Sequence, residues 1–332
     1  MKVGIAASLL YYHYFYLWKT FFEELGLEVV VSSPTNKRIV ENGVKKAVDD
    51  ICLPVKLTFG HVMDLAGRVD YLFIPRLVSL EPDAFTCPKI IGLPDMIKAN
   101  LDKLPPVLDT CFDLKKGRSL YQSFRELGRN FTHKSSLIQQ AFEKAEIKQR
   151  EFEKIMEQGL TPLEAIEVLE KSLSSAGNNP GETPPDNLRI ALIGHPYNLY
   201  DDYLNMSLID KLRQRNCRVI TAEMLPAAVM KKESSAWNRD IFWTLGRRMV
   251  GAACHFFKSG VVDGIISCVS FECGPDSLLQ VLIEEEAGKH KELPYMSLII
   301  DEHTGDAGIV TRIEAFLDMI RRKATIQKNK NR

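Results

Sequence analysis

The stretch Leu188–Gly194 (LRIALIG), followed at once by His195-Pro196, decides the fold. It is a mostly apolar run of strand length that ends in glycine, which is typical of a strand buried on both faces of a parallel sheet. Similar runs recur along the chain, with helical patterns between them. They are Lys2–Ala6, Leu27–Ser32, Val69–Pro75, Cys217–Thr221, Val262–Val269 and Tyr295–Ile300. This alternation predicts an α/β protein with mostly parallel sheets.

A long helical segment separates the two sets of strands. Apolar residues recur at near-helical spacing from about Lys134 to Leu173, and Thr161–Glu164 (TPLE) has the pattern of a capping box that starts a new helix. Ser174–Pro185 (SSAGNNPGETPP) then indicates a linker. We predict two doubly wound, Rossmann- or flavodoxin-like domains joined by a long helical segment. The expected parts are an N-terminal α/β domain at 1–133, a helical connection and linker at 134–186, a C-terminal α/β domain at 187–323 and a basic tail at 324–332.

The composition is that of a soluble globular protein without a polyanionic partner. Hydrophobic residues make up 45% of the 332 residues, and 43 basic residues balance 43 acidic ones. This balance argues against nucleic-acid binding. Aromatic residues and His13 interrupt the apolar N-terminal stretch, so we expect a strand and a helix there instead of a signal peptide. No run reaches the ~18 apolar residues that span a bilayer, and we expect a cytoplasmic protein without membrane association.

Seven cysteines divide into two groups by their sequence context. Cys52, Cys87 and Cys273 each have a proline within two residues on the C-terminal side. Because proline is tolerated in the first turn of a helix, we expect each of these thiols at a helix entrance, where the helix dipole favours the thiolate. The other four are predicted to be structural thiols, with Cys111 in a loop, Cys254 in a helix and Cys217 and Cys268 in strands.

Three thiolates are soft ligands that suit an iron–sulfur cluster or a zinc ion. Their spacing forms no compact motif such as CxxC, so from spacing alone a shared metal site and three structural thiols both remain open. If the thiols converge, they leave one iron of a cubane without a protein thiolate.

Six motifs occur in order around and beyond these cysteines. The first-half motifs are Cys52-Leu-Pro-Val-Lys-Leu57, Tyr71-Leu-Phe-Ile-Pro-Arg76 and Cys87-Pro-Lys89 with Gly92-Leu-Pro-Asp95. The second-half motifs are Gly194-His-Pro-Tyr-Asn198, Phe271-Glu-Cys-Gly-Pro-Asp-Ser277 and Asp301-Glu-His-Thr-Gly305 with Thr311-Arg-Ile-Glu-Ala-Phe316. Together they resemble the acyl-CoA dehydratase activase-related family, in the superfamily of 2-hydroxyacyl-CoA dehydratases and double-cubane cluster proteins. The likeness runs from Lys2 to about Met319.

The resemblance implies an oxygen-sensitive electron-transfer protein with a [4Fe–4S] cluster on Cys52, Cys87 and Cys273, in the cleft between its domains. It implies one cluster per chain, because a double cubane needs more thiolates than these three. The expected electron donor is an ATP-hydrolysing activase with its own iron–sulfur cluster. The expected substrate is a 2-hydroxyacyl-CoA or a small molecule that is hard to reduce, with a dehydratase-like partner subunit or a second copy of the chain. No phosphate-binding loop is visible, so this chain is expected to accept the electron.

Three further residues are catalytic candidates. His195 directly follows a predicted strand, and so does the segment with Glu302 and His303. In open α/β folds such positions lie at the carboxyl edge of the sheet, where ligands bind. We expect His195 to donate to the cluster or to a substrate carbonyl. Glu302 and His303 are expected to act as proton donors or to hydrogen-bond a neighbouring ligand.

Other polar residues near the cysteines have more ordinary expectations. Lys56 and Lys89 are expected to be exposed, and Asp276 is expected to cap the helix that follows Cys273. Two other functions remain open. In the first, Cys52, Cys87, Cys273 and His195 close a structural or regulatory zinc site. In the second, the chain is a metal-free scaffolding subunit of a dehydratase.

Overall fold

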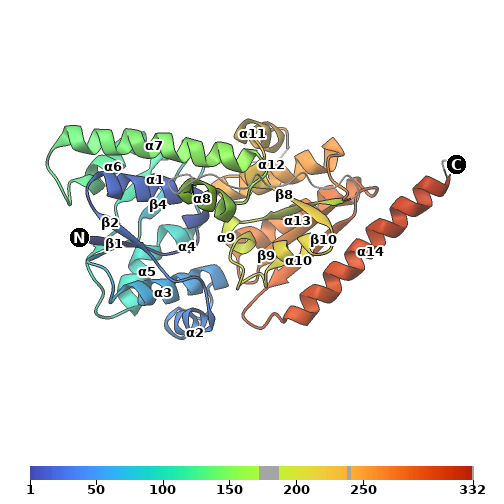
Figure 1. The fold of residues 1–332 in the computed structure, drawn as a ribbon, viewed down its shortest axis with the longest axis horizontal. Helices are drawn as coiled ribbons and strands as arrows, with labels where there is room; N and C mark the ends of the chain where they lie inside the picture. Colours follow the sequence, from blue (N-terminus) through green and yellow to red (C-terminus); the bar gives the residue numbers. More distant parts are fainter. Residues whose placement is uncertain (172–186, 238–240, 331–332) are drawn as a thin grey trace.

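The computed structural model describes residues 1–171, 187–237 and 241–330. Two parallel sheets lie side by side in it, with helices around both (Figure 1). The predicted linker Ser174–Pro185 lies outside the described residues.

Both sheets have the same strand order, which confirms the predicted fold class. The first sheet is β2 (Glu28–Val31), β1 (Lys2–Ile5), β3 (Tyr71–Phe73) and β5 (Val107–Leu108), and all its pairs are parallel. The second sheet is β8 (Cys217–Thr221), β7 (Leu188–Gly194), β9 (Gly264–Ser270) and β10 (Tyr295–Ile300), again all parallel. We call residues up to 171 the first half of the chain and residues from 187 on the second half. In each half the first strand is an inner strand of its sheet. The second strand lies on one side of it, and the later strands lie on the other side. The strand order therefore reverses between β1 and β3 and between β7 and β9, where such folds bind ligands.

A further parallel pair extends from the first sheet. It joins β4 (Arg76–Ser79) to β6 (Cys111–Asp113). Cys111 therefore opens a strand, and the prediction that it lies in a loop was wrong. Its neighbours Thr110 and Phe112 are buried, because the segment continues β5 and pairs with the chain that follows β3.

The predicted long helical connection forms two helices. α7 (Ser135–Glu157) packs along α1 (Tyr11–Glu24) and runs from the outer end of the first half towards the second half (Figure 1). α8 (Pro162–Lys171) begins at the predicted capping box. Thr161 N donates to Glu164 Oε2 at 2.8 Å, and Glu164 N donates to Thr161 Oγ1 at 3.3 Å. The predicted start of a new helix at Pro162 is confirmed.

The remaining helices surround the two sheets. In the first half they are α2 (Lys37–Lys46), α3 (Leu53–Leu65), α4 (Pro88–Ile91), α5 (Leu93–Asn100) and α6 (Leu120–Gly128). In the second half they are α9 (Pro196–Leu199), α10 (Leu208–Arg213), α11 (Ala227–Ser235), α12 (Thr244–Ser259), α13 (Gly274–Lys289) and α14 (Asp306–Lys330). α14 continues past residue 324, where a basic tail was predicted to begin, and projects beyond the second sheet (Figure 1). In the described part of the chain, no helix combines the length and the apolar character needed to cross a membrane. The domain boundaries stay predictions.

Two glycines let α2 and α3 approach closely. A Cβ atom added to Gly60 would lie 2.0 Å from the carbonyl oxygen of Ile39, and one added to Gly43 would lie 2.2 Å from that of Lys56. Both carbonyl oxygens belong to the backbone and cannot rotate away. A side chain at either glycine would therefore fit only if the two helices moved apart. This contact fixes the position of α3, whose N-cap residue Cys52 is a candidate ligand.

We expect Gly60→Ala to lower the free energy of unfolding by about 1–3 kcal/mol, because the added methyl group forces α2 away from α3. Urea denaturation of both proteins measures the difference. Gly67→Ala is the matched control, since its Cβ would meet nothing within 4 Å. Equal midpoints for Gly60→Ala and Gly67→Ala would show that the close approach is unimportant.

Candidate functional site

The three candidate ligand cysteines occupy equivalent positions at the starts of three helices. Cys52 is the N-cap residue of α3, Cys87 that of α4 and Cys273 that of α13, and each helix has proline in its first two positions. None of the three side chains makes a capping hydrogen bond. The predicted location of the three cysteines at helix entrances is confirmed.

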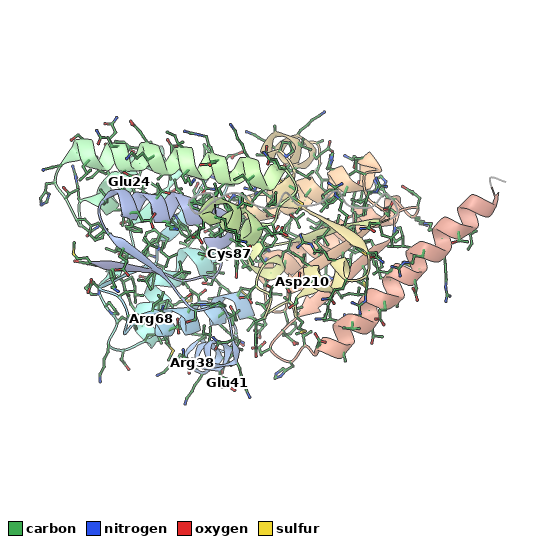
Figure 2. The ribbon with its side chains drawn as sticks, viewed as in Figure 1. Glu24, Arg38, Glu41, Arg68, Cys87 and Asp210 are labelled. Atoms are coloured by element: carbon green, nitrogen blue, oxygen red, sulfur yellow. The ribbon has the colours of Figure 1, made fainter. Side chains whose placement is uncertain are left out.

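These helix starts come together between the two halves. A hydrogen bond joins the thiols of Cys52 and Cys273, and the charge on Cys52 acts on Cys87. The pKa of the Tyr197 hydroxyl is raised well above its usual value, first by burial and then by its neighbours Cys273, Asp276, Cys87 and Cys52, which places all three thiols near this ring. Cys52 and Cys273 are buried, and Cys87 lies near the middle of the molecule (Figure 2). Thiols from three separate segments therefore share one site, and metal binding by them stays a prediction.

The thiols differ in charge when no metal is bound. The hydrogen bond from Cys273 lowers the pKa of Cys52 to about 7, despite the opposing effect of burial. The same hydrogen bond and burial raise the pKa of Cys273, and burial raises that of Cys87. Only Cys52 thus has the thiolate character predicted for all three, because neighbouring thiols in a dry site do not all ionise without a cation. A metal centre would supply that positive charge. The three thiols are therefore suitable ligands for a metal centre.

His195 and Asp276 lie beside the thiols. His195 directly follows β7, is buried, and its ring stacks on Tyr197 with 5.0 Å between centroids. Its Nδ1 is 2.5 Å from Asp276 Oδ1, but the angles are not those of a hydrogen bond, and both buried atoms lack a hydrogen-bond partner in the described structure. Atoms of His195, Cys273 and Asp276 that could hold a metal ion lie within 4.8 Å of one another. The unsatisfied atoms also fit a site that takes an additional group.

Asp276 does not cap α13, so that prediction was wrong. Its Oδ2 accepts from Ser270 N at 3.1 Å and from Asn198 Nδ2 at 3.2 Å, and its side chain is fully buried. Cys273 already occupies the N-cap position, which leaves Asp276 facing the segments that leave β7 and β9. Asp276 therefore ties these segments together where the strand order reverses.

Lys56 is buried, against the expectation that it is exposed. Its side chain is 8% exposed, and its Nζ lies 2.7 Å from Glu302 Oε1 and 3.4 Å from Glu272 Oε2. Glu272 has a φ of 62°, which is an unfavourable backbone conformation for a residue other than glycine. Lys89 donates to the carbonyl oxygen of Glu272 at 3.1 Å. Two lysines of the first half thus hold the strained turn that presents Cys273.

The other predicted catalytic residues have different surroundings. Burial raises the pKa of Glu302, but the hydrogen bond and charge of Lys56 outweigh it and leave the pKa below its usual value. Glu302 is therefore a carboxylate at neutral pH and lacks a proton to donate. His303 is exposed, and its backbone N–H donates to Asp301 Oδ1 at 2.9 Å. The catalytic roles of His195, Glu302 and His303 stay predictions.

Sequence reasoning missed the polar network around Asp276. Ser270 Oγ donates to Asn198 Oδ1 at 2.6 Å, deep in the protein. A signal was present, since Ser270 is a polar residue at the end of an apolar strand and Asn198 lies three residues after His195. For the turn at Glu272 no such signal exists, because no glycine or asparagine marks its left-handed backbone.

One family model matches the chain, and it is described as a CoA enzyme activase uncharacterised domain. It covers residues 2–225, which is more than half of the sequence. The matched region contains Cys52, Cys87 and His195 and ends before Cys273. A search of curated proteins gave no match.

Proposed function

This chain belongs to the family of the CoA enzyme activase uncharacterised domain, and from that premise we propose that it is an iron–sulfur protein that transfers low-potential electrons. Cys52, Cys87 and Cys273 would hold one [4Fe–4S] cluster. The observation that carries the proposal is the meeting of three N-cap cysteines from separate segments around Tyr197. Soft thiolates are the ligands that iron–sulfur clusters take.

When bound, the cluster would supply one-electron transfer, from an ATP-hydrolysing activase with its own iron–sulfur cluster to a substrate. The activase is oxidised by one electron, and ATP hydrolysis drives the transfer. The substrate class is a 2-hydroxyacyl-CoA that loses water, or a small molecule that is reduced. A dehydration would return the electron at the end of each turnover, whereas a reduction would consume it.

The protein's own residues would stabilise the charge at this site. Each of the three helices has a backbone N–H group that lowers the pKa of the cysteine at its start and so favours the thiolate. These groups belong to Val55, Ile90 and Asp276. Positive ends of three helices therefore point at the same place. Burial of Cys52 and Cys273 limits access of water, and both factors tune the potential of a cluster.

The test is to measure iron, acid-labile sulfide and the visible spectrum of protein purified without oxygen. We expect about four irons and four sulfides per chain, with a broad absorption that bleaches on reduction. About eight irons would indicate a double cubane. Protein without metal after anaerobic reconstitution would overturn the proposal and favour the scaffolding role.

A structural zinc site is the second candidate, and one observation favours it. His195 and Cys273 offer a nitrogen and a sulfur in the same group of buried metal-ligating atoms. With Cys52 and Cys87 they would complete a Cys₃His set, which zinc binds in closed structural sites. Colourless protein with one zinc per chain and no sulfide would establish this alternative.

A further inference from the structure

A separate cavity lies between the two halves, away from the thiols. Its volume is about 350 Å³, which is in the range of small-molecule sites. One wall is the loop Glu81–Asp83 of the first half, and the other is formed by α11 and α12 of the second half. None of the cysteines lines it.

The cavity contains an arginine that forms no close ion pair among the described residues. Arg248 Nη1 is 2.6 Å from His13 Nε2, and in the described part of the chain no carboxylate forms an ion pair with the guanidinium. Burial and the charge of Arg248 lower the pKa of His13 well below its usual value. His13 is therefore neutral, so it accepts a hydrogen bond from Arg248 without compensating the charge, and the nearest compensation comes from Glu81, whose pKa the charge of Arg248 lowers. A partly buried charge of this kind favours an anion as its partner.

Neither acidic residue of the wall forms an ion pair with Arg248. Asp83 pairs with the neighbouring Arg247 at 2.8 Å. Glu81 lies 3.9 Å from the same arginine, and burial raises its pKa although the charges of Arg248 and Arg247 lower it in part. Lys231, exposed at the rim, forms no ion pair within the described ranges. Three cationic and two acidic side chains line the cavity, which leaves one positive charge in excess.

The rest of the wall is apolar. Met230 and Ile241 are buried, and Trp237 is partly exposed beside them. Such a wall accommodates a hydrocarbon or aromatic group, while the arginine selects for charge.

We propose that this cavity binds a small organic anion, whose carboxylate or phosphate pairs with Arg248 and Lys231 and whose apolar part lies against Trp237 and Met230. Its walls come from both halves, so the bound anion would also join them. The inference does not depend on the metal content of the protein.

Isothermal titration calorimetry of the full-length protein with benzoate, phenyl phosphate and benzamide tests the proposal. We expect saturable binding of benzoate or phenyl phosphate, and binding of uncharged benzamide at least about tenfold weaker, as for the loss of a charged hydrogen bond. Preference for benzoate identifies a carboxylate ligand, and preference for phenyl phosphate identifies a phosphate. Equal binding of benzamide, or no binding of either anion at 10 mM (roughly 2.7 kcal/mol of affinity or less), would overturn it.

Substitutions in and beside the cavity test where the anion binds. Arg248→Met should weaken anion binding at least about tenfold. Lys231→Met should weaken it to a smaller extent, whereas Lys232→Met, on the same helix but outside the cavity, should leave it unchanged. Ala227→Phe fills part of the cavity without changing a charge and should reduce binding even if Arg248→Met fails to fold. Full affinity in Ala227→Phe, or equal losses in the two lysine variants, would place the anion elsewhere.

Discussion

A Cys273→Ala variant purified without oxygen is expected to lose most of its iron and to keep its fold. Cys273 is the ligand that the second half would contribute, and its helix and strand are held by contacts that do not involve the sulfur. Removing one of three protein ligands leaves an incomplete donor set. Iron and sulfide analysis measures the loss, and circular dichroism checks the fold.

The matched control is Cys254→Ala. Cys254 is 3% exposed and Cys273 4%, so both substitutions remove a buried thiol, but Cys254 lies inside α12. Burial raises the pKa of Cys254 to about 11, which is the behaviour of a structural thiol. We expect this variant to retain the iron content of the wild type. Unchanged iron in Cys273→Ala would refute the assignment of that residue as a ligand.

Lys56→Met is expected to lower the free energy of unfolding by about 3–5 kcal/mol. Its ammonium is buried between Glu302 and Glu272, and its loss would leave two partly buried carboxylates without their cation. Urea denaturation at neutral pH measures the change. Lys37→Met is the control, because the ion pair of Lys37 with Glu41 is largely exposed and contributes about 0–1 kcal/mol at most.

The pH dependence offers a second measurement of this bridge. Burial lowers the pKa of Lys56, but the hydrogen bond and charge of Glu302 outweigh it and raise the pKa above 10.5. The pKa of Glu302 lies below its ordinary 4.5. The bridge therefore stabilises the protein between these values. Its contribution is lost as the pH falls through the folded pKa of Glu302 or rises through that of Lys56. A stability difference between wild type and Lys56→Met that persists at pH 2 would contradict this assignment.

Local patterns in the sequence predict the elements well and the contacts between distant segments poorly. The strands Leu188–Gly194, Cys217–Thr221 and Tyr295–Ile300 have the predicted bounds, because runs of apolar residues encode burial directly. The three helix starts at the cysteines follow from the prolines beside them. These features depend on neighbouring residues only.

The burial of Lys56 and the role of Asp276 depend on tertiary structure. Lys56 is separated by 216 residues from Glu272 and by 246 from Glu302, and nothing near a lysine in the sequence reports such partners. Aspartate is a common capping residue, but Cys273, three residues before Asp276, occupies the N-cap position of α13. The shared site of the three thiols likewise arises only when both sheets are in place.

The origin of the three thiols also determines when the site exists during synthesis of the protein. Cys52 and Cys87 leave the ribosome early, whereas Cys273 follows after a stretch that takes about 10–40 s to translate. Until then, a first half that has already folded presents two thiols and a helix start without their third partner. If these thiols hold the proposed cluster, its insertion would come after translation of the second half, and the nascent chain would need protection from oxidation during that interval.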